Sequence, residues 1–581
     1  MSDITCDVLV VGGSLGGVAA ALRAGSWGAK VVLLEPSGWL GGQMTAQGVC
    51  TPDENAWIET VGGTDSYRSF RQRVREHYRT SHALTAQAKA LTYLNVGECW
   101  VSLGFSVEPL VGSRLLAQML AEVPDVTVLP LSVQGVTVDG DRVTRVAAAG
   151  EDGAVTQIVP AYVLDATDLG DVLPLAGAEW VIGAESQADT GEPDALPEAR
   201  PAWVQPLTFP FALERRPVGE DHTIPEPPDY AALKARQEYS LKDGSITRAF
   251  TGASPWWTYR RVIDAGLFQD PDFPYDIATI NVKANDYEGG VVPTGDPAQD
   301  AQILAQARQA SLGYVYWIQT ECPRDDNPAR RGYPELKLRA DFFGTPDGLA
   351  PAPYVRESRR IRARRTIREQ DISAAANPGP RAAPMADACG VGHYMMDVHA
   401  NSGTGEAGQW IATKPYQIAL GALVPVRLQN LLPACKNLGV THLTNGSYRL
   451  HPVEWNVGEA AGALAFFCNG EGVTPAAVLG DTTLLRTFQR MLVEAGVPLF
   501  WWSDVPFGHP AFAATQMLGA AGLFTGNGTD LRFEPDAAFP SGEQQVFSQD
   551  LGRDLAWPNR HLTRGEAAIW LARELDLVPA V

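Results

Sequence analysis

A glycine-rich stretch near the start of the chain, Gly12–Gly17, has the residue types and spacing that bind a phosphate group. It follows the apolar run Val8–Val11 and precedes an alanine-rich stretch, so we expect it at a strand-to-helix turn. Backbone N–H groups in the first turn of a helix lack partners within the helix, and the helix dipole attracts negative charge there. A second apolar run, Val31–Leu34, ends on Glu35, whose carboxylate could accept hydrogen bonds from a ribose. These residues predict a dinucleotide site in a βαβ unit rather than an ordinary tight turn.

The glycine stretch departs from the G-x-G-x-x-G spacing at one position, because Ser14 stands at the middle glycine. A serine side chain is small enough to allow close approach of a phosphate and could donate to it. The pair Gly41-Gly42 follows Glu35 closely and favours FAD over a nicotinamide dinucleotide. The flavin part of FAD must extend past the loop after the ribose-binding acid, whereas a nicotinamide domain needs no second Gly-Gly there. Gly403–Gly408 has the same literal spacing, but no strand precedes it and Lys414-Pro415 follows soon, so we interpret it as a loop.

Two later stretches could complete the cofactor site. A strand expected at 163–168 ends in Ala166, Thr167 and Asp168, which contact the cofactor in one interpretation and only cap the next helix in the other. The stretch 445–463 predicts a helix that starts near Pro452. Its Gly458, Ala461 and Gly462 allow close packing, and its N-terminus could face the flavin; the alternative is an ordinary core helix.

Three histidines are candidates for handling a substrate proton, His393, His399 and His451, and the family resemblance quoted below implies that their stretches contact the flavin. An imidazole can both take and give a proton near neutral pH. Asp397 precedes His399 at the i, i+2 spacing of one strand face, so its carboxylate could fix the tautomer of His399 and raise its basicity. We predict His399 as the proton acceptor, with Tyr394 or Arg449 as polarising partners and His451 orienting the ring. The alternative is that His399 only hydrogen-bonds FAD or a loop.

The elements that must position these residues predict an α/β chain. We expect a FAD-binding Rossmann-like domain with three layers in the order ββα, an inserted α+β substrate domain and a helical C-terminal region. The predicted boundaries are 1–190 for the first part of the FAD domain, with an excursion at 50–105, then 191–385 for the substrate domain, 386–478 for the closing part and 479–581 for the C-terminal region. Within them we expect a strand at 97–102, a three-strand meander over 126–149 and a helix near 297–321. Arginines of the stretch 356–368 could bind an anionic substrate or form an ion-paired strand face.

Composition narrows the class of protein. The 581 residues are enough for two to four domains, and the net charge of −21 disfavours nucleic acid or an anionic membrane as a partner. No run approaches the roughly 18 apolar residues of a spanning helix. The first strand begins near residue 7, which leaves no room for a signal peptide, and the 7 cysteines form no C-x-x-C pair. We therefore expect a cytoplasmic protein with reduced thiols and no disulfide reductase chemistry.

Taken together, the motifs VVGGSLGG, LLEPSGWLGGQMTAQGV, LDATDLGD and GSYRLHPVEWNVGEAAGALA resemble FAD-dependent oxidoreductases of the two-dinucleotide-fold, glutathione-reductase-like superfamily, a group similar to the fumarate-reductase flavoproteins. The resemblance implies non-covalent FAD and names no substrate. The His-Gly-Ala-Asn-Arg block of the fumarate-reductase flavoproteins has no match, which argues against succinate or fumarate. The residues expected to contact FAD are Gly12, Gly13, Ser14, Leu15, Gly16, Gly17, Glu35, Pro36, Gly41, Gly42, Gln43, Thr45, Val133, Ala166, Thr167, Asp168, Pro452, Trp455 and Asn456.

The expected activity is hydride transfer between a small organic substrate and flavin N5, with no metal and with the electron acceptor left open. A binding or scaffold protein that keeps FAD as a structural ligand is the competing class. A flavin monooxygenase is less favoured, because no second strand–glycine–helix unit for NADPH is visible. The chain could form a homo-oligomer. Segments between 504 and 567 resemble an S-layer-homology module, although we prefer a helical cap on the flavoprotein.

Overall fold

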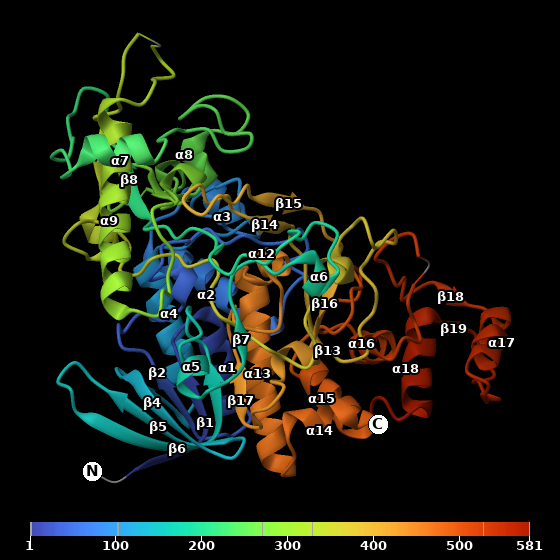
Figure 1. Ribbon diagram of the computed structural model, residues 1–581. Helices are drawn as coiled ribbons and strands as arrows, with labels where there is room; N and C mark the ends of the chain where they lie inside the picture. The colour runs from blue at the N-terminus through green and yellow to red at the C-terminus, as the bar shows by residue number, and fades with distance from the viewer. Residues whose placement is uncertain (1–2, 102–103, 270, 328, 527, 580–581) are drawn as a thin grey trace.

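A seven-stranded sheet at the lower left of Figure 1 contains the N-terminal strands of the computed structural model, which describes residues 3–101, 104–269, 271–327, 329–526 and 528–579. The sheet order is β3-β2-β1-β6-β5-β4, with β17 beside β6. The central strands β1 (Ile4–Val11), β2 (Val31–Leu34) and β6 (Val155–Asp165) run parallel. Their buried residues belong to two apolar clusters, one shared with α1 (Leu15–Ser26) and α13 (His451–Glu471) and the other with residues 143–148 and 172–178. β17 (Leu431–Pro433) pairs in parallel with the carboxyl end of β6, so the chain returns to this sheet late in the sequence.

The strand that follows α4 (Pro109–Ala121) corrects the predicted meander. β3 (Val126–Leu129) pairs in parallel with β2, and only β4 (Ser132–Asp139), β5 (Arg142–Ala149) and β6 form antiparallel hairpins. A helical crossover brings the chain back parallel to the strand it left, and strand propensity alone does not show this pairing. The strand predicted at 97–102 is also wrong: residues 97–101 form bends and turns around the Asn95 side chain, and Ser102 lies outside the described residues.

Two helices cross over the glycine turn with their backbones in contact. α1 (Leu15–Ser26) follows the turn, and α13 (His451–Glu471) packs across it. A Cβ on Gly458 would lie 1.9 Å from Gly16 O, and a Cβ on Gly462 would lie 2.3 Å from Ala20 O. The close packing predicted for the small residues of α13 is therefore confirmed.

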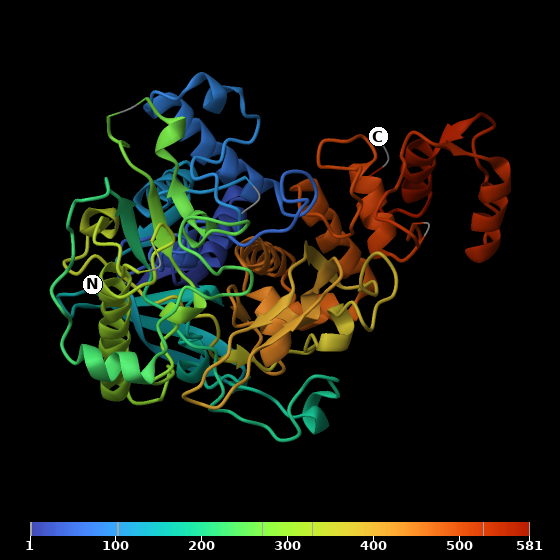
Figure 2. The ribbon, with the colours of Figure 1, turned by 90° about the horizontal axis from the view of Figure 1, so that it is seen from above.

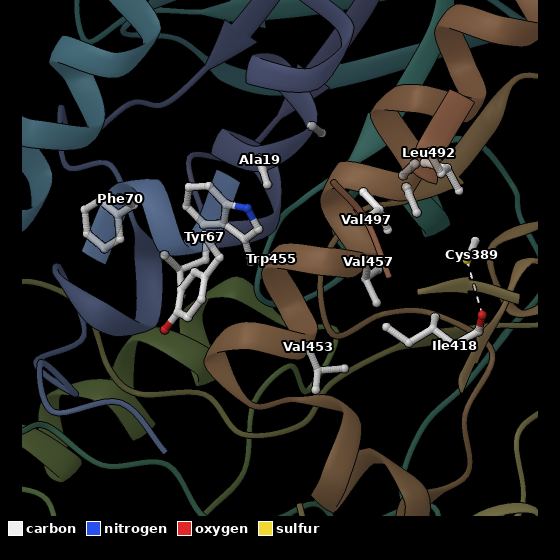
Figure 3. Packing of buried hydrophobic residues seen from close by; sticks show 14 of the residues in the cluster. Ala19, Tyr67, Phe70, Cys389, Ile418, Val453, Trp455, Val457, Leu492 and Val497 are labelled. Carbon is white, nitrogen blue, oxygen red and sulfur yellow. Dashed lines mark hydrogen bonds between the residues drawn. The ribbon is translucent and has the colours of Figure 1, made fainter. Parts of the chain in front are cut away.

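On another face of α13, Trp455 fills the space beside α2 (Asp65–Ser81). Its ring stacks on Phe70 with centroids 5.9 Å apart and tilts against Tyr67 at 5.5 Å, as Figure 3 shows. The predicted helical excursion after residue 50 is thus tied to the late helix by a buried aromatic contact.

A second body with its own apolar core stands beside the sheet. Its antiparallel sheet has the order β11-β8-β10-β9, made of β8 (Phe211–Arg215), β9 (Arg261–Ile263), β10 (Ile277–Ile280) and β11 (Leu336–Leu338). The long helix α9 (Pro297–Thr320) packs against it at the upper left of Figure 1 and matches the helix predicted there.

Shorter elements complete the body: α3 (Ala86–Ala90), α5 (Val172–Leu175), β7 (Trp180–Val181), α6 (Gln187–Thr190), α7 (Tyr230–Arg236), α8 (Trp256–Tyr259), α10 (Ala340–Phe343), β12 (Arg360–Ile361), α11 (Glu369–Ile372), β13 (Ala388–Gly392), β14 (Met396–Val398), β15 (Gln409–Ile411), β16 (Tyr416–Ala419) and α12 (His442–Tyr448). Short 3₁₀ turns lie at Gly42–Met44, Ala265–Leu267, Lys283–Asn285 and Leu420–Leu423. Gly403–Gly408 lies in a stretch of turns, as predicted.

The C-terminal region is mainly helical and packs on the body. It contains α14 (Pro475–Gly480), α15 (Thr482–Glu494), α16 (Phe512–Ala520), β18 (Ala538–Phe539), α17 (Ser541–Asp550), β19 (Leu562–Thr563) and α18 (Arg564–Glu574). Phe488 and Trp502 belong to the main core, and Trp501 Nε1 donates to Tyr416 O at 2.8 Å. Figure 2 shows α17 at the outer end of this region. None of the helices in the described parts of the chain has the length and apolarity required to cross a bilayer.

Candidate active site

The glycine turn brings β1, α1 and β6 into direct contact. Gly12 has φ +105°, and a Cβ there would lie 2.5 Å from Ala166 O, so only glycine fits. Ser14 is the N-cap of α1, with its Oγ accepting from the Gly17 N–H at 3.1 Å. Glu35 Oε2 accepts from the Gly13 N–H at 2.9 Å, which holds the carboxylate at the turn.

The loop that starts at Gly41 lies across this turn. Gly41 and Gly42 have φ +104° and +46°, and a Cβ on Gly42 would lie 3.0 Å from Ser14 Cα. Gln43 Nε2 donates to Arg449 O at 3.0 Å and also to the Glu454 carboxylate, which accepts from the Gly16 N–H at 3.2 Å. The start of α1, this loop and the start of α13 thus meet at one place.

Unpartnered polar atoms mark the same place as a ligand site. Within the described residues, Gln43 Oε1 and Gln47 Oε1 are buried without a hydrogen-bond partner, and buried polar groups normally have one. Asp168 accepts from Lys436 Nζ and from Gln47 Nε2, both at 2.6 Å. Thr167 Oγ1 accepts from the Asp171 N–H at 2.7 Å, but the N-cap of α5 is Asp171 without a side-chain cap, so neither Thr167 nor Asp168 caps this helix.

Beside this place opens a cavity of about 670 Å³ lined by both bodies. Its charged lining residues include Asp53, Arg260, Arg356, Asp397, His399 and Arg449. Arg449 belongs to both sites, because its carbonyl accepts from Gln43 while its side chain reaches the cavity.

His399 sits between two carboxylates. Its Nδ1 lies 2.5 Å from Asp286 Oδ2, and its Nε2 lies 3.3 Å from Asp397 Oδ2. Burial and the Arg356 guanidinium lower the pKa of His399, but the carboxylates of Asp397 and Asp286 outweigh them, so the net pKa is above the usual value. Although burial disfavours the charged Asp397 carboxylate, His399 and Arg449 hold the pKa of Asp397 well below its usual range.

The remaining predicted partners lie on the same cavity. Arg449 Nη2 lies 3.1 Å from Asp397 Oδ2, and its Nη1 donates to Tyr354 Oη at 2.6 Å. Tyr394 Oη lies 3.5 Å from Asp53 Oδ1, and burial raises the pKa of Tyr394 well above its usual value. The cavity therefore offers an imidazole and a phenol, both with a raised pKa, and a guanidinium.

The comparison that decides the class of protein is with a family model of FAD dependent oxidoreductases, which matches residues 7–492. The chain belongs to this family. FAD is its cofactor, and the glycine turn, the 41–45 loop and the orphaned glutamines are a donor and acceptor set that fits such a group.

Individual proteins resemble this flavoprotein only in part. Glutathione reductase of Schizosaccharomyces pombe is 51% identical over 51 residues, which is 9% of this chain and 11% of that enzyme. The OxyS anhydrotetracycline hydroxylase from Streptomyces rimosus has a TM-score of 0.31 and 12% identity over 96% of this chain and 77% of its own. L-proline dehydrogenase from P. horikoshii has a TM-score of 0.17 and 16% identity, over 32% of this chain and 25% of its own. At these values neither structural likeness bears on the activity of the flavoprotein.

Two residues that we expect to contact FAD form hydrogen bonds with other groups of the protein. Trp455 Nε1 donates to Ser66 Oγ at 2.8 Å, and Asn456 Oδ1 accepts from the Val391 N–H at 3.1 Å. Pro452 is in the first turn of α13, Pro36 is exposed beyond Glu35, and Val133 lies in β4, four residues beyond Leu129 at the end of β3.

His451 differs from His399 in its surroundings. Its Nδ1 accepts from the Asp53 N–H at 3.3 Å, and its Nε2 lies 3.1 Å from Val49 O. Burial lowers the pKa of His451 to about 3, so it stays neutral. Both ring nitrogens of His451 contact backbone groups, so His451 holds the loop at 49–53 in place.

Two arginines of the stretch 356–368 lie in different surroundings, one on the cavity and one in an ion pair away from it. Arg356 lines the cavity and lies 2.8 Å from Asp286, whereas Arg359 pairs with Asp171 at 3.2 Å. Sequence analysis did not single out Asp286, Asp53, Arg260 or Lys436 as parts of the site. No spacing signal marks them, because each gains its partner from a distant segment.

Proposed function

We propose that this flavoprotein transfers a hydride between a small organic substrate in the 670 Å³ cavity and N5 of non-covalently held FAD, with His399 handling the substrate proton. The observation that carries the proposal is the position of His399 between Asp286 and Asp397 on the wall of the cavity. Arg449 lines the same cavity and also accepts a hydrogen bond from the loop at 41–45. FAD, when bound, supplies a two-electron acceptor or donor for this chemistry.

The protein residues divide the remaining work. Asp286 Oδ2, at 2.5 Å from Nδ1, orients the imidazole so that Nε2 faces Asp397 and the cavity. Neutral His399 takes a proton when substrate is oxidised, and the protonated ring returns it in the reverse direction. Arg449 and Tyr394 on the cavity wall are placed to polarise the reacting oxygen or nitrogen.

The test is flavin reduction in a single anaerobic turnover. A reductant is first found by screening alcohols, amines and acids for bleaching of the flavin absorbance. We expect His399→Gln protein that retains FAD to be reduced 10²–10⁴-fold more slowly, the usual loss for an acid–base group. His222→Gln is the matched control, because His222 also pairs with a carboxylate, Glu220 at 2.6 Å, and is not among the lining residues of the cavity.

A rate for His399→Gln within about threefold of the parent contradicts the assignment of His399. If dithionite bleaches the flavin but no organic candidate does, the binding or scaffold class replaces the enzyme.

We further propose that residues 479–581 cap the flavoprotein body and do not act as a free polymer-binding module. The support is the direct contact of this region with the body: Gln417 Nε2 donates to Leu499 O, and Arg381 donates to Trp501 O at 2.9 Å and to Thr525 O at 2.7 Å. The family match ends at residue 492, within α15.

A further inference from the structure

We propose that the cavity binds a neutral, ring-shaped polyol, that is, a carbohydrate, and not an anionic substrate. The proposal rests on the proposed function only in taking the 670 Å³ cavity as the substrate site. Its volume lies within the range of about 300–1,000 Å³ common for ligand sites.

The arginines of the cavity wall are already paired with carboxylates, and His399 shares Asp286 and Asp397 with two of them. Each arginine that lines the cavity forms an ion pair: Arg260 with Asp53 at 3.2 Å, Arg356 with Asp286 at 2.8 Å and Arg449 with Asp397 at 3.1 Å. The same wall carries the exposed Lys283 and the carboxylate of Asp243, which accepts from the backbone N–H of Lys283 at 3.2 Å. An anionic substrate would have to compete with carboxylates already in place, against a net charge of −21 on the whole chain.

Matched ion pairs present both donors and acceptors at close spacing. A hydroxyl group donates one hydrogen bond and accepts two, so a polyol can use both members of each pair. Tyr259 and Tyr394 add hydroxyl groups to the same wall. This lining suits a substrate with many hydroxyl groups and no net charge.

Two indole rings at the edge of the cavity supply the second feature. Trp410 is 66% exposed and Trp100 is 40% exposed, unusual for large apolar side chains that line a site. In the β14–β15 ribbon Trp410 lies directly opposite Asp397, so its indole and that carboxylate share one face of the ribbon. The C–H face of a sugar ring stacks on such an indole while its hydroxyl groups reach the carboxylate, an arrangement that fits neither a purely apolar nor a purely ionic substrate.

The test measures binding separately from turnover. Holoenzyme is titrated with methyl glycosides of common hexoses and pentoses and with myo-inositol, up to tens of millimolar, by calorimetry and by flavin absorbance. Succinate, benzoate and glucuronate are the anionic comparisons. We expect at least one neutral polyol to bind and to bind more tightly than every anion. Trp410→Ala should weaken that binding tenfold or more, whereas Trp180→Ala, an exposed indole away from the cavity, should leave it unchanged.

The outcomes separate the two proposals. A polyol that binds in a Trp410-dependent way but does not reduce the flavin supports the carbohydrate site and contradicts its use in hydride transfer. Binding of an anion in preference to every polyol, absence of polyol binding, or polyol binding indifferent to Trp410 overturns the carbohydrate site. Flavin reduction by some other substrate would then leave the proposed hydride transfer intact.

Discussion

Glu35 is the residue whose removal tests the cofactor site most directly. Its Oε2 accepts from the Gly13 N–H at 2.9 Å, and its Oε1 accepts from the Ser37 N–H at 2.9 Å. Glu35→Ala leaves the donors of the turn and of a bound ribose unsatisfied, so we expect FAD retention to weaken by about 1–3 kcal/mol. The measurement is FAD content after gel filtration at low protein concentration. Glu35→Gln keeps an acceptor and serves as the control. Equal FAD content in the parent and Glu35→Ala would exclude a ribose-binding role for Glu35.

Asp397 provides a second test at a single residue, through the pKa of His399. The Asp397 carboxylate raises this pKa, so the neutral imidazole that accepts a proton forms only at higher pH. In the parent, the rate of flavin reduction by an oxidisable substrate should rise with pH through a pKa above the usual value for histidine. Asp397→Asn removes the charge, so the rising limb should move to lower pH.

The matched control for this pH profile is Asp341→Asn, which removes an exposed carboxylate of α10 paired with Arg339. A profile that Asp397→Asn leaves in place, or moves to higher pH, would show that His399 does not set the rising limb.

The crossing of α1 and α13 is the element on which the cofactor site depends. A Cβ on Gly458 would meet Gly16 O at 1.9 Å and push α13 away from the glycine turn, whereas a Cβ on Gly470 of the same helix meets no atom within 4 Å. Gly458→Ala should lower stability by about 1–3 kcal/mol and reduce FAD content, since overpacking moves the backbone. Gly470→Ala should leave stability unchanged or raise it by up to about 1 kcal/mol.

Thermal unfolding with and without added FAD measures both glycine variants. If Gly458→Ala melts like the parent and holds FAD equally well, the backbones of α1 and α13 are not in direct contact at Gly458 and Gly16.

At the scale of the whole molecule, we expect the C-terminal region and the body to stay together as one unit. Trp501 and Trp502 are 1% and 0% exposed, and their burial joins this region to the core. α17 contains no buried residue, so brief proteolysis should first cut within 541–560 and not near 472–482. Mass spectrometry of the early fragments, together with the flavin absorbance, follows this reaction. Release of an intact fragment beginning near residue 479, from a body that keeps full activity, would show an independent module.

Features that depend on residues close together in the chain can be predicted from the order of the residues alone. The strand, glycine turn and helix of residues 4–26 and the acid at Glu35 are contiguous, so their spacing predicts both the βαβ unit and its ligand class. The close packing at Gly458 and Gly462 can also be predicted, because small residues at helical spacing indicate close packing whatever the partner.

The pairs of residues that face one another in the cavity come from distant parts of the chain and are known only from the folded structure. His399 and Asp286 are 113 residues apart, and Arg260 and Asp53 are 207 residues apart, so no local pattern joins either pair. The parallel pairing of β3 with β2 and the turns at 97–101 also escaped prediction. Strand propensity does not say with which neighbour a strand pairs. Side chains from distant segments meet only when apolar cores bring their elements together, and hydrogen bonds and charge pairs then form between whichever groups packing has placed in reach.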